Sequence, residues 1–173
     1  MIYIGLIKQL LRQEEGVKHE LYLDTAGYWT YGVGHLVDHS KIAAFAWLNS
    51  ELTKHGTYEA VTEYWFNKDL ETHLKIAQDI CPNFNDIGPA RQCVIASLAW
   101  QFGGKLYGYE QTRRLIKAND WLELSDLLTT YRDYKKVRGI RRRFNRARVL
   151  LLIGCDARPY TVQVLISELH RII

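Results

Sequence analysis

Several features that define particular protein classes are scarce or absent in this sequence. Three prolines and twelve glycines argue against a collagen-like or linker-like chain. The three cysteines, Cys81, Cys93 and Cys155, are odd in number and include no CxxC spacing, which argues against a disulfide framework or a zinc site. We expect three buried, reduced thiols. No apolar run approaches the roughly 18 residues that span a bilayer.

The N-terminal segment lacks the parts of a secretion signal. Residues 1–11 are apolar but short, Lys8 interrupts them, and neither a basic start nor a small-residue cleavage site is present. We therefore expect the protein to be made in the cytoplasm without a signal peptide.

The composition that remains is that of a globular protein. The 173 residues suit one domain, which can be divided into two lobes, and 47% of them are hydrophobic while 24% are charged. The formal net charge of +4 is compatible with an anionic polymer as partner but does not identify which one. Much of this positive charge lies between residues 132 and 148.

Periodicity predicts a helix, a small β-rich unit and then mostly helices. Apolar residues recur at helical spacing over residues 3–14, and Gly16 can end that helix. Residues 21–33 are β-prone around Thr25-Ala26-Gly27, which predicts a hairpin with Gly27 in the turn. Gly32 and Gly34 flank Val33 and indicate a close backbone approach. Further helices are expected at 43–52, 58–80, 90–102, 111–118, 120–131, 140–153 (with Gly154 as a stop) and 159–173.

The expected fold class is α+β, dominated by helix. We expect a single domain over residues 1–173. Its parts are a β-rich lobe at about 16–57, a linking helix at about 58–80, a helical lobe of about 1–15 plus 81–158, and a C-terminal extension at 159–173.

One stretch carries residues suited to glycoside hydrolysis. That reaction needs two carboxyl groups on opposite sides of one bond. Glu15 ends the first helix, Asp24 borders the hairpin turn, and Thr30 on the returning strand could hold a water near Asp24. On spacing alone, a Glu at a helix end and an Asp beside a turn are more typical of surface residues or caps, and spacing does not separate Glu15 from Glu14.

The same stretch resembles the signature of the phage-type lysozymes, glycoside hydrolase family 24. That pattern is Glu-Gly, then Tyr-x-Asp-x-x-Gly, then Thr-x-Gly-x-Gly-His. Each letter is present, as Glu15, Gly16, Tyr22, Asp24, Gly27, Thr30, Gly32, Gly34 and His35. Weaker similarity continues to about residue 154, and the segment from Pro159 lies outside it.

The resemblance implies a function and a mechanism. It implies a lysozyme-like two-lobed fold and hydrolysis of the β-1,4 bond between N-acetylmuramic acid and N-acetylglucosamine in peptidoglycan. Glu15 would be the general acid, Asp24 the carboxylate that activates water, and Thr30 its partner. Inversion is implied, which needs the two carboxyl groups roughly 6.5–9.5 Å apart. No cofactor or metal is implied.

The resemblance also implies where the protein acts and with what. The expected partner is the glycan strand of peptidoglycan, with no nucleic acid and no membrane span, and the protein is expected to be a monomer. It would reach the wall from the periplasm after release from the host cytoplasm, causing lysis; a tail-associated enzyme used at entry is the alternative.

Further roles are carried over from the family to single residues. Leu36, Gln101, Phe102 and Arg143 would bind substrate. His35 would form a structural ion pair with Asp69, tying the hairpin unit to the long helix, although a catalytic base is the alternative for a lone histidine. Tyr28, Trp29, Trp100 and Phe102 could line a sugar groove, with the core as the alternative for the last two.

The arginine-rich segment leaves its role open. It could be a solvated helix face, a wall- or nucleic-acid-binding patch, or, at Arg143, a neighbour of the acidic cleft residue. Family members often carry Glu at the position of Asn145, so this helix is expected to be braced differently. Its basic residues are Arg138, Arg141, Arg142, Arg143, Arg146 and Arg148.

Two functions other than catalysis compete with the lysozyme hypothesis. One is a catalytically inactive wall-binding module on the same fold, which the intact set of Glu15, Asp24 and Thr30 argues against. The other is a helical nucleic-acid-binding protein, which would leave the glycine-rich hairpin unexplained.

Overall fold

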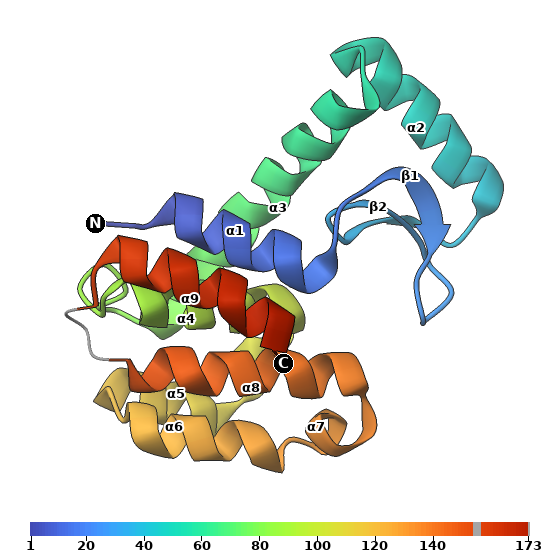
Figure 1. The fold of residues 1–173 in the computed structure, drawn as a ribbon. Coiled ribbons are helices and arrows are strands. Elements are labelled where there is room, and N and C mark those ends of the chain that lie inside the picture. Colours follow the sequence, from blue (N-terminus) through green and yellow to red (C-terminus); the bar gives the residue numbers. More distant parts are fainter. Residues whose placement is uncertain (154–156, 173) are drawn as a thin grey trace. The chain divides into compact units, whose positions relative to one another are not determined.

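The computed structural model describes residues 1–153 and 157–172 and confirms the expected fold class. The chain is mostly helical with one small antiparallel sheet (Figure 1). It divides into two compact units: Leu11–Thr72, and Met1–Leu10 together with His73–Ile173. Helices α1 (Ile4–Glu15) and α3 (Tyr58–Ile80) each contribute residues to both units.

The unit Leu11–Thr72 is built on a three-stranded sheet in the order β1-β2-β3. Its strands are β1 (Lys18–Leu23), β2 (Trp29–Gly32) and β3 (His35–Asp38). The expected hairpin is confirmed, because β1 and β2 pair antiparallel with Tyr22 opposite Thr30. The third strand was not expected from the sequence.

Helix α2 (Lys41–His55) packs against β3 and completes the core of this unit. Ser40 caps the helix by accepting a hydrogen bond from the backbone N–H of Ala43, which satisfies one of the free donors at a helix start. The core of the unit is formed by Tyr31, Leu48 and Val61.

The second unit consists of helices. They are α4 (Pro89–Phe102), η1 (Gly103–Gly108), α5 (Glu110–Ala118), α6 (Trp121–Leu127), η2 (Leu128–Thr130), α7 (Arg132–Lys136), α8 (Arg138–Leu152) and α9 (Pro159–Ile172). Helix α4 lies at its centre, with ten of its residues buried, as its apolar sequence predicts. The prediction of a single helix at 120–131 is wrong, since the chain tightens into the 3₁₀ segment η2 after Leu127.

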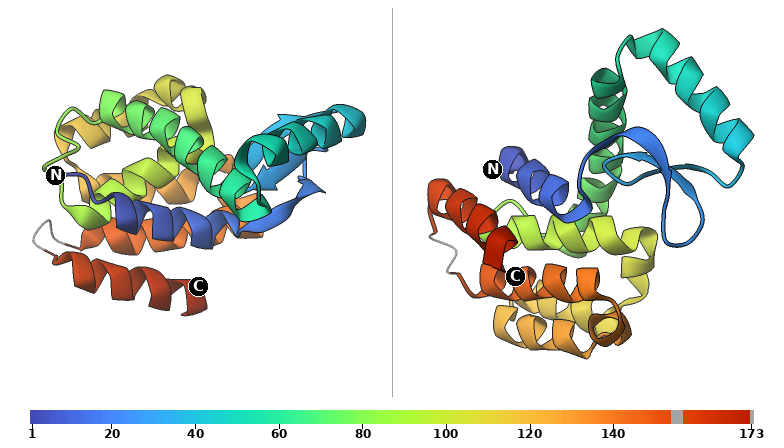
Figure 2. Two further views of the ribbon diagram at one scale, coloured as in Figure 1. Left: turned by 90° about the horizontal axis from the view of Figure 1, so that it is seen from above. Right: turned by 45° about the vertical axis from the view of Figure 1, so that its right-hand side comes forward.

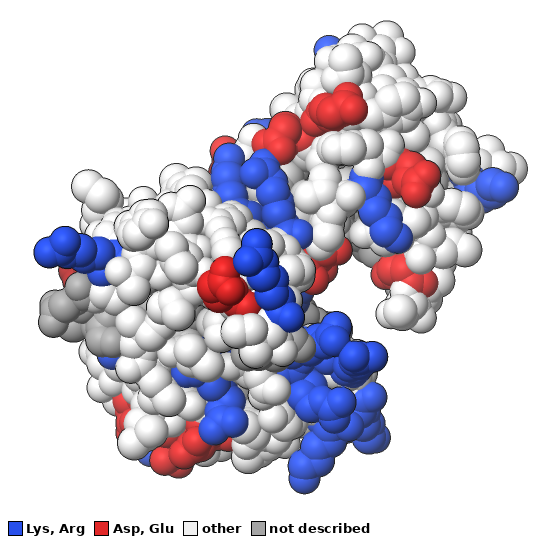
Figure 3. Space-filling model, in the orientation of Figure 1, with Lys and Arg blue, Asp and Glu red and all other residues white. Residues whose placement is uncertain are grey.

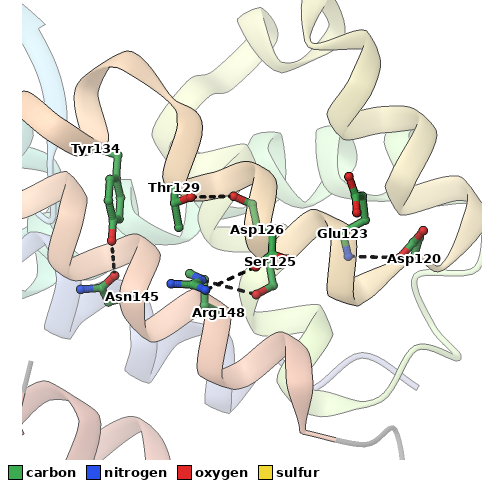
Figure 4. Close-up of polar contacts among 8 residues, drawn as sticks. All are labelled: Asp120, Glu123, Ser125, Asp126, Thr129, Tyr134, Asn145 and Arg148. Atoms are coloured by element: carbon green, nitrogen blue, oxygen red, sulfur yellow. Dashed lines mark hydrogen bonds and ion pairs between the residues drawn. The ribbon is translucent and has the colours of Figure 1, made fainter.

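Helix α8 is attached to its neighbours by polar contacts (Figure 4). Arg148 donates hydrogen bonds to Ser125 and Asp126 of α6, both at 3.4 Å. Tyr134 of α7 donates its hydroxyl to Asn145 at 2.9 Å. Asn145 thus holds α8 to α7 through a neutral hydrogen bond.

The C-terminal helix α9 packs against α4 and lies alongside α8 (Figure 2). Val162 and Ile166 are fully buried, and Gln9 donates a hydrogen bond to the Ser167 hydroxyl at 3.0 Å. The segment beyond the family resemblance is therefore an integral part of this unit's core.

Two of the three cysteines lie in the described part of the chain. Cys81 and Cys93 are buried, as predicted, and burial raises the pKa of Cys81 to about 11. Cys155 and the expected helix stop at Gly154 lie outside the described residues.

Candidate active site

Glu15 lies at the junction of a helix and a sheet. It is the last residue of α1, and the helix ends at Gly16, which has a positive φ of 75° and donates its N–H to the Arg12 carbonyl. Gly34 passes close to the Glu15 side chain. A Cβ at Gly34 would lie 3.5 Å from Glu15 Oε2, an ordinary contact distance, but φ is +76° there, so the backbone conformation favours glycine.

An open pocket of about 390 Å³ brings together the three residues to which the resemblance gives a catalytic role. Its walls come from the end of α1 and from all three strands. The lining residues are Glu15, Lys18, Tyr22, Leu23, Asp24, Thr25, Thr30, Gly34 and Leu36. Glu15, and not Glu14, is among them, which supports the choice that the signature made.

One oxygen of Asp24 shapes the β1–β2 turn. Asp24 Oδ1 accepts hydrogen bonds from the backbone N–H groups of Ala26 at 2.9 Å and Tyr28 at 2.8 Å. Gly27 closes the turn with φ +85° and donates its N–H to the Asp24 carbonyl. Among the described residues no hydrogen bond to Oδ2 is formed, so this second oxygen can act on a water.

Thr30 presents an acceptor at the same site. It is 4% exposed, lines the pocket and donates its hydroxyl proton to the Tyr28 carbonyl at 3.2 Å. Because the proton is used in this way, the Thr30 oxygen is left with lone pairs for a donor such as water.

Tyr22 and Lys18 belong to the pocket but were not singled out as functional by the sequence. Burial and the nearby charges of Glu15 and Asp24 raise the pKa of Tyr22, partly offset by a hydrogen bond from the Gly34 backbone. Tyr22 is therefore a neutral phenol at physiological pH. The Lys18 ammonium lies 4.1 Å from the centre of the Tyr22 ring.

His35 and Asp69 lie together next to the pocket. The distance from His35 Nδ1 to Asp69 Oδ2 is 2.8 Å. The imidazole is stacked against the indoles of Trp65 and Trp47, with ring centres at 4.3 and 5.5 Å. Trp65 in turn donates its indole N–H to the buried carboxylate of Glu51 at 2.9 Å. Neither tryptophan nor Glu51 was expected to have a role here.

Comparison with known proteins identifies the family. The sequence pattern of the phage lysozyme family matches residues 12–147. The chain belongs to the phage lysozyme family. The match includes the whole pocket and both carboxylates, and it ends before α9.

The individual relatives within this family have low sequence identity to the chain. The chain is 25% identical to the pre-baseplate central spike protein of Enterobacteria phage T4, over 90% of this chain but 29% of that protein. It is 27% and 24% identical to two Dictyostelium discoideum proteins named as probable T4-type lysozymes 1 and 2. Those matches cover 69% of this chain and 79% of each relative.

The remaining residues expected to bind substrate in a phage lysozyme lie in the helical unit. Arg143 is buried and donates a hydrogen bond to the Gln101 side-chain oxygen. Phe102 is half-buried and packs against the rings of Tyr109, Tyr131 and Phe144. These rings line a second pocket of about 210 Å³. Trp100 is also half-buried. Because neither Trp100 nor Phe102 is fully buried, neither ring belongs wholly to the core.

The arginine-rich segment is not one uniform solvated face. Arg143 and Arg146 are buried in α8, whereas the exposed cations gather over α7 and the first turns of α8 (Figure 3). The exposed ones are Arg132, Lys135, Lys136, Arg138, Arg141 and Arg142. No described helix is long and apolar enough to cross a membrane.

Proposed function

We propose that this protein is a lysozyme that hydrolyses the β-1,4 bond between N-acetylmuramic acid and N-acetylglucosamine in peptidoglycan. Membership of the phage lysozyme family supports a glycoside hydrolase of the lysozyme type. The observation that carries the proposal for this chain is the single open pocket lined by Glu15, Asp24 and Thr30.

In the proposed reaction, Glu15 is the acid and Asp24 is the base. Glu15 transfers its proton to the glycosidic oxygen as the bond to the anomeric carbon breaks. A water attacks that carbon, and Asp24 Oδ2 takes the proton that the water loses. Each product gains a hydroxyl group, and exchange with solvent returns the two carboxyl groups to their starting protonation states.

Thr30 gives the water its orientation in this proposal. A water that donates one hydrogen bond to Asp24 Oδ2 and the other to the Thr30 oxygen has a lone pair left for the anomeric carbon. Oδ1 is bound by Ala26 and Tyr28, which supports a fixed carboxylate plane. A carboxylate that acts on water, rather than on the sugar itself, implies inversion of configuration.

The substrate would also contact Leu36 in this pocket, and Gln101, Phe102 and Arg143 in the helical unit. The His35–Asp69 pair would fix β3 to α3 as a structural brace, since its imidazole is covered by two indoles. We propose that the whole chain acts as one lysozyme domain, as a monomer, on the wall of the host from the periplasm, with cell lysis as the result.

The test compares Glu15→Gln with Glu14→Gln in a turbidity assay on purified peptidoglycan. The two variants differ by one position on the same helix end and keep the same size, so the second is a matched control. Loss of a positioned acid lowers turnover by about 10²–10⁴-fold. We expect that loss for Glu15→Gln only. Equal activity of both variants would show that Glu15 is not the acid. A wild type that is inactive but still binds the wall would support the inactive binding module instead.

A further inference from the structure

The pocket contains one cation beside its two carboxyl groups. Among its nine lining residues, Lys18 is the only lysine or arginine. It is exposed and forms no ion pair within the described part of the chain. Its ammonium is held instead over the face of the Tyr22 ring, at 4.1 Å from the ring centre. The charge of Lys18 is therefore not neutralised by the protein at this site.

The position of Lys18 follows from how the strand is held. Lys18 is the first residue of β1, pairs with Gly32, and is followed by an irregularity in the ladder before Tyr22 pairs with Thr30. Tyr22 is half-buried and lies opposite Thr30 in the ladder, so the ring under the ammonium belongs to a paired residue of the sheet. A cation over a fixed aromatic face is attracted to it without losing its charge.

The charge of the proposed substrate differs between its two sugars. N-acetylglucosamine is neutral, whereas N-acetylmuramic acid carries a lactyl group that ends either in a free carboxylate or in a peptide with carboxylates of its own. Asp24, which is ionised as the proposed base, would repel such a group elsewhere in the pocket. Among the described residues that line the pocket, Lys18 alone offers an opposite charge.

We propose that Lys18 binds a carboxylate of the muramyl substituent and so determines which of the two sugars occupies this pocket. The inference rests on the proposed function and makes Lys18 a specificity residue. Its effect should fall on substrate binding. An exposed ion pair of this kind changes affinity by roughly two- to five-fold, and the change should shrink at high salt.

The test uses Lys18→Met, which keeps an unbranched side chain and removes the charge. Lys41→Met is the matched control, because Lys41 also lies over aromatic rings, Trp29 and Phe45, in the same unit but outside the pocket lining. Both are compared with wild type on three glycans: intact peptidoglycan strands, strands freed of peptides by an amidase, and peptide-free strands whose lactyl carboxylates have been converted to amides.

We expect Lys18→Met to raise KM on a carboxylate-bearing glycan about two- to five-fold with kcat little changed, and to have no effect on the amidated glycan. Lys41→Met should match wild type on all three. A KM effect on the peptide-free strands identifies the lactyl carboxylate, and an effect on intact strands alone identifies the peptide. An equal effect on the amidated glycan, or an effect confined to kcat, overturns the proposal.

A binding experiment separates this inference from the proposed function. In the Glu15→Gln background, sedimentation with insoluble peptidoglycan measures affinity without turnover. Weaker binding caused by Lys18→Met but not by Lys41→Met supports the inference, even if the wild type proved inactive and the proposed function failed. Unchanged binding in this background contradicts the inference while leaving the hydrolysis data untouched.

Discussion

Asp24 has two oxygens with separate tasks, and two substitutions can separate them. Oδ1 accepts the N–H groups of Ala26 and Tyr28 and so closes the β1–β2 turn. Oδ2 is proposed to act on the water. Asp24→Asn keeps an acceptor oxygen for the turn and replaces the other oxygen by an amide nitrogen, whereas Asp24→Ala removes both. We expect the two variants to be equally inactive but unequally stable.

The size of the difference follows from the hydrogen bonds that are lost. A side-chain oxygen that caps exposed backbone N–H groups contributes about 0.5–2 kcal/mol, and bonds to a charged acceptor lie toward the upper end of the range. Asp24→Ala loses two such bonds, so we expect a loss of about 2 kcal/mol. Asp24→Asn replaces charged bonds by neutral ones and should lose less than about 1 kcal/mol.

Urea unfolding gives the two stabilities, and turbidity of purified peptidoglycan gives the two activities. Since an amide cannot take a proton from water, we expect Asp24→Asn to lose activity by about 10²–10⁴-fold. If Asp24→Asn were as unstable as Asp24→Ala, the hydrogen bonds accepted by Oδ1 would not be what stabilises the β1–β2 turn. If Asp24→Asn kept near-normal turnover, Asp24 would not be the base.

Two further predictions follow from the site and its surroundings. Burial alone would raise the pKa of Glu51, but hydrogen bonds from Lys54 and Trp65 and the charges of Lys54 and His55 lower it below 4.5. Glu51 therefore adds stability that is complete above pH 4.5 and lost as pH falls through the lowered value. In urea unfolding, Glu51→Gln should cost about 1–2 kcal/mol at pH 7, and its difference from wild type should disappear as the pH falls through that value. If the difference in unfolding free energy between Glu51→Gln and wild type did not change with pH, the stabilising role of ionised Glu51 would be contradicted. For the stereochemistry, NMR of the fresh hydrolysis product should show the α-anomer first, and an initial β-anomer would make Asp24 a nucleophile instead of a base.

The long elements of this fold could be predicted because their signals are local. The helix at 58–80 was predicted with the bounds that the structure gives it, since no glycine or proline interrupts its sequence. The hairpin turn could be predicted because Gly27 is one of the few residues that adopt a positive φ without strain. In both cases the residues that determine the structure are near neighbours in the sequence.

The short elements could not be predicted in the same way. Strand β3 has only four residues, half-buried and exposed in turn, and it becomes a strand because β2 supplies its hydrogen-bond partners. The break between α6 and η2 is similar, because a 3₁₀ turn differs from a helical one by a single hydrogen-bond step. These outcomes depend on what packs against the segment.

The site shows the same division between local and distant signals. The signature selected Glu15, Asp24 and Thr30, which the structure brings into one pocket. It gave no role to Lys18, and it did not connect His35 with Trp47 and Trp65. The stacking around His35 joins three elements, β3, α2 and α3, and no spacing rule in the sequence links them.

The pocket also explains why so short a sequence segment can specify the proposed chemistry. Glu15 and Asp24 are nine positions apart, and both belong to the unit Leu11–Thr72. The end of one helix, one turn and two glycines determine where their side chains lie. Lys18 lies between the two acids on the same strand as Tyr22. The proposed acid, the proposed base and the cation that would select the substrate are therefore all supplied by ten consecutive residues, and a substitution at any one of them can be interpreted against the same local framework.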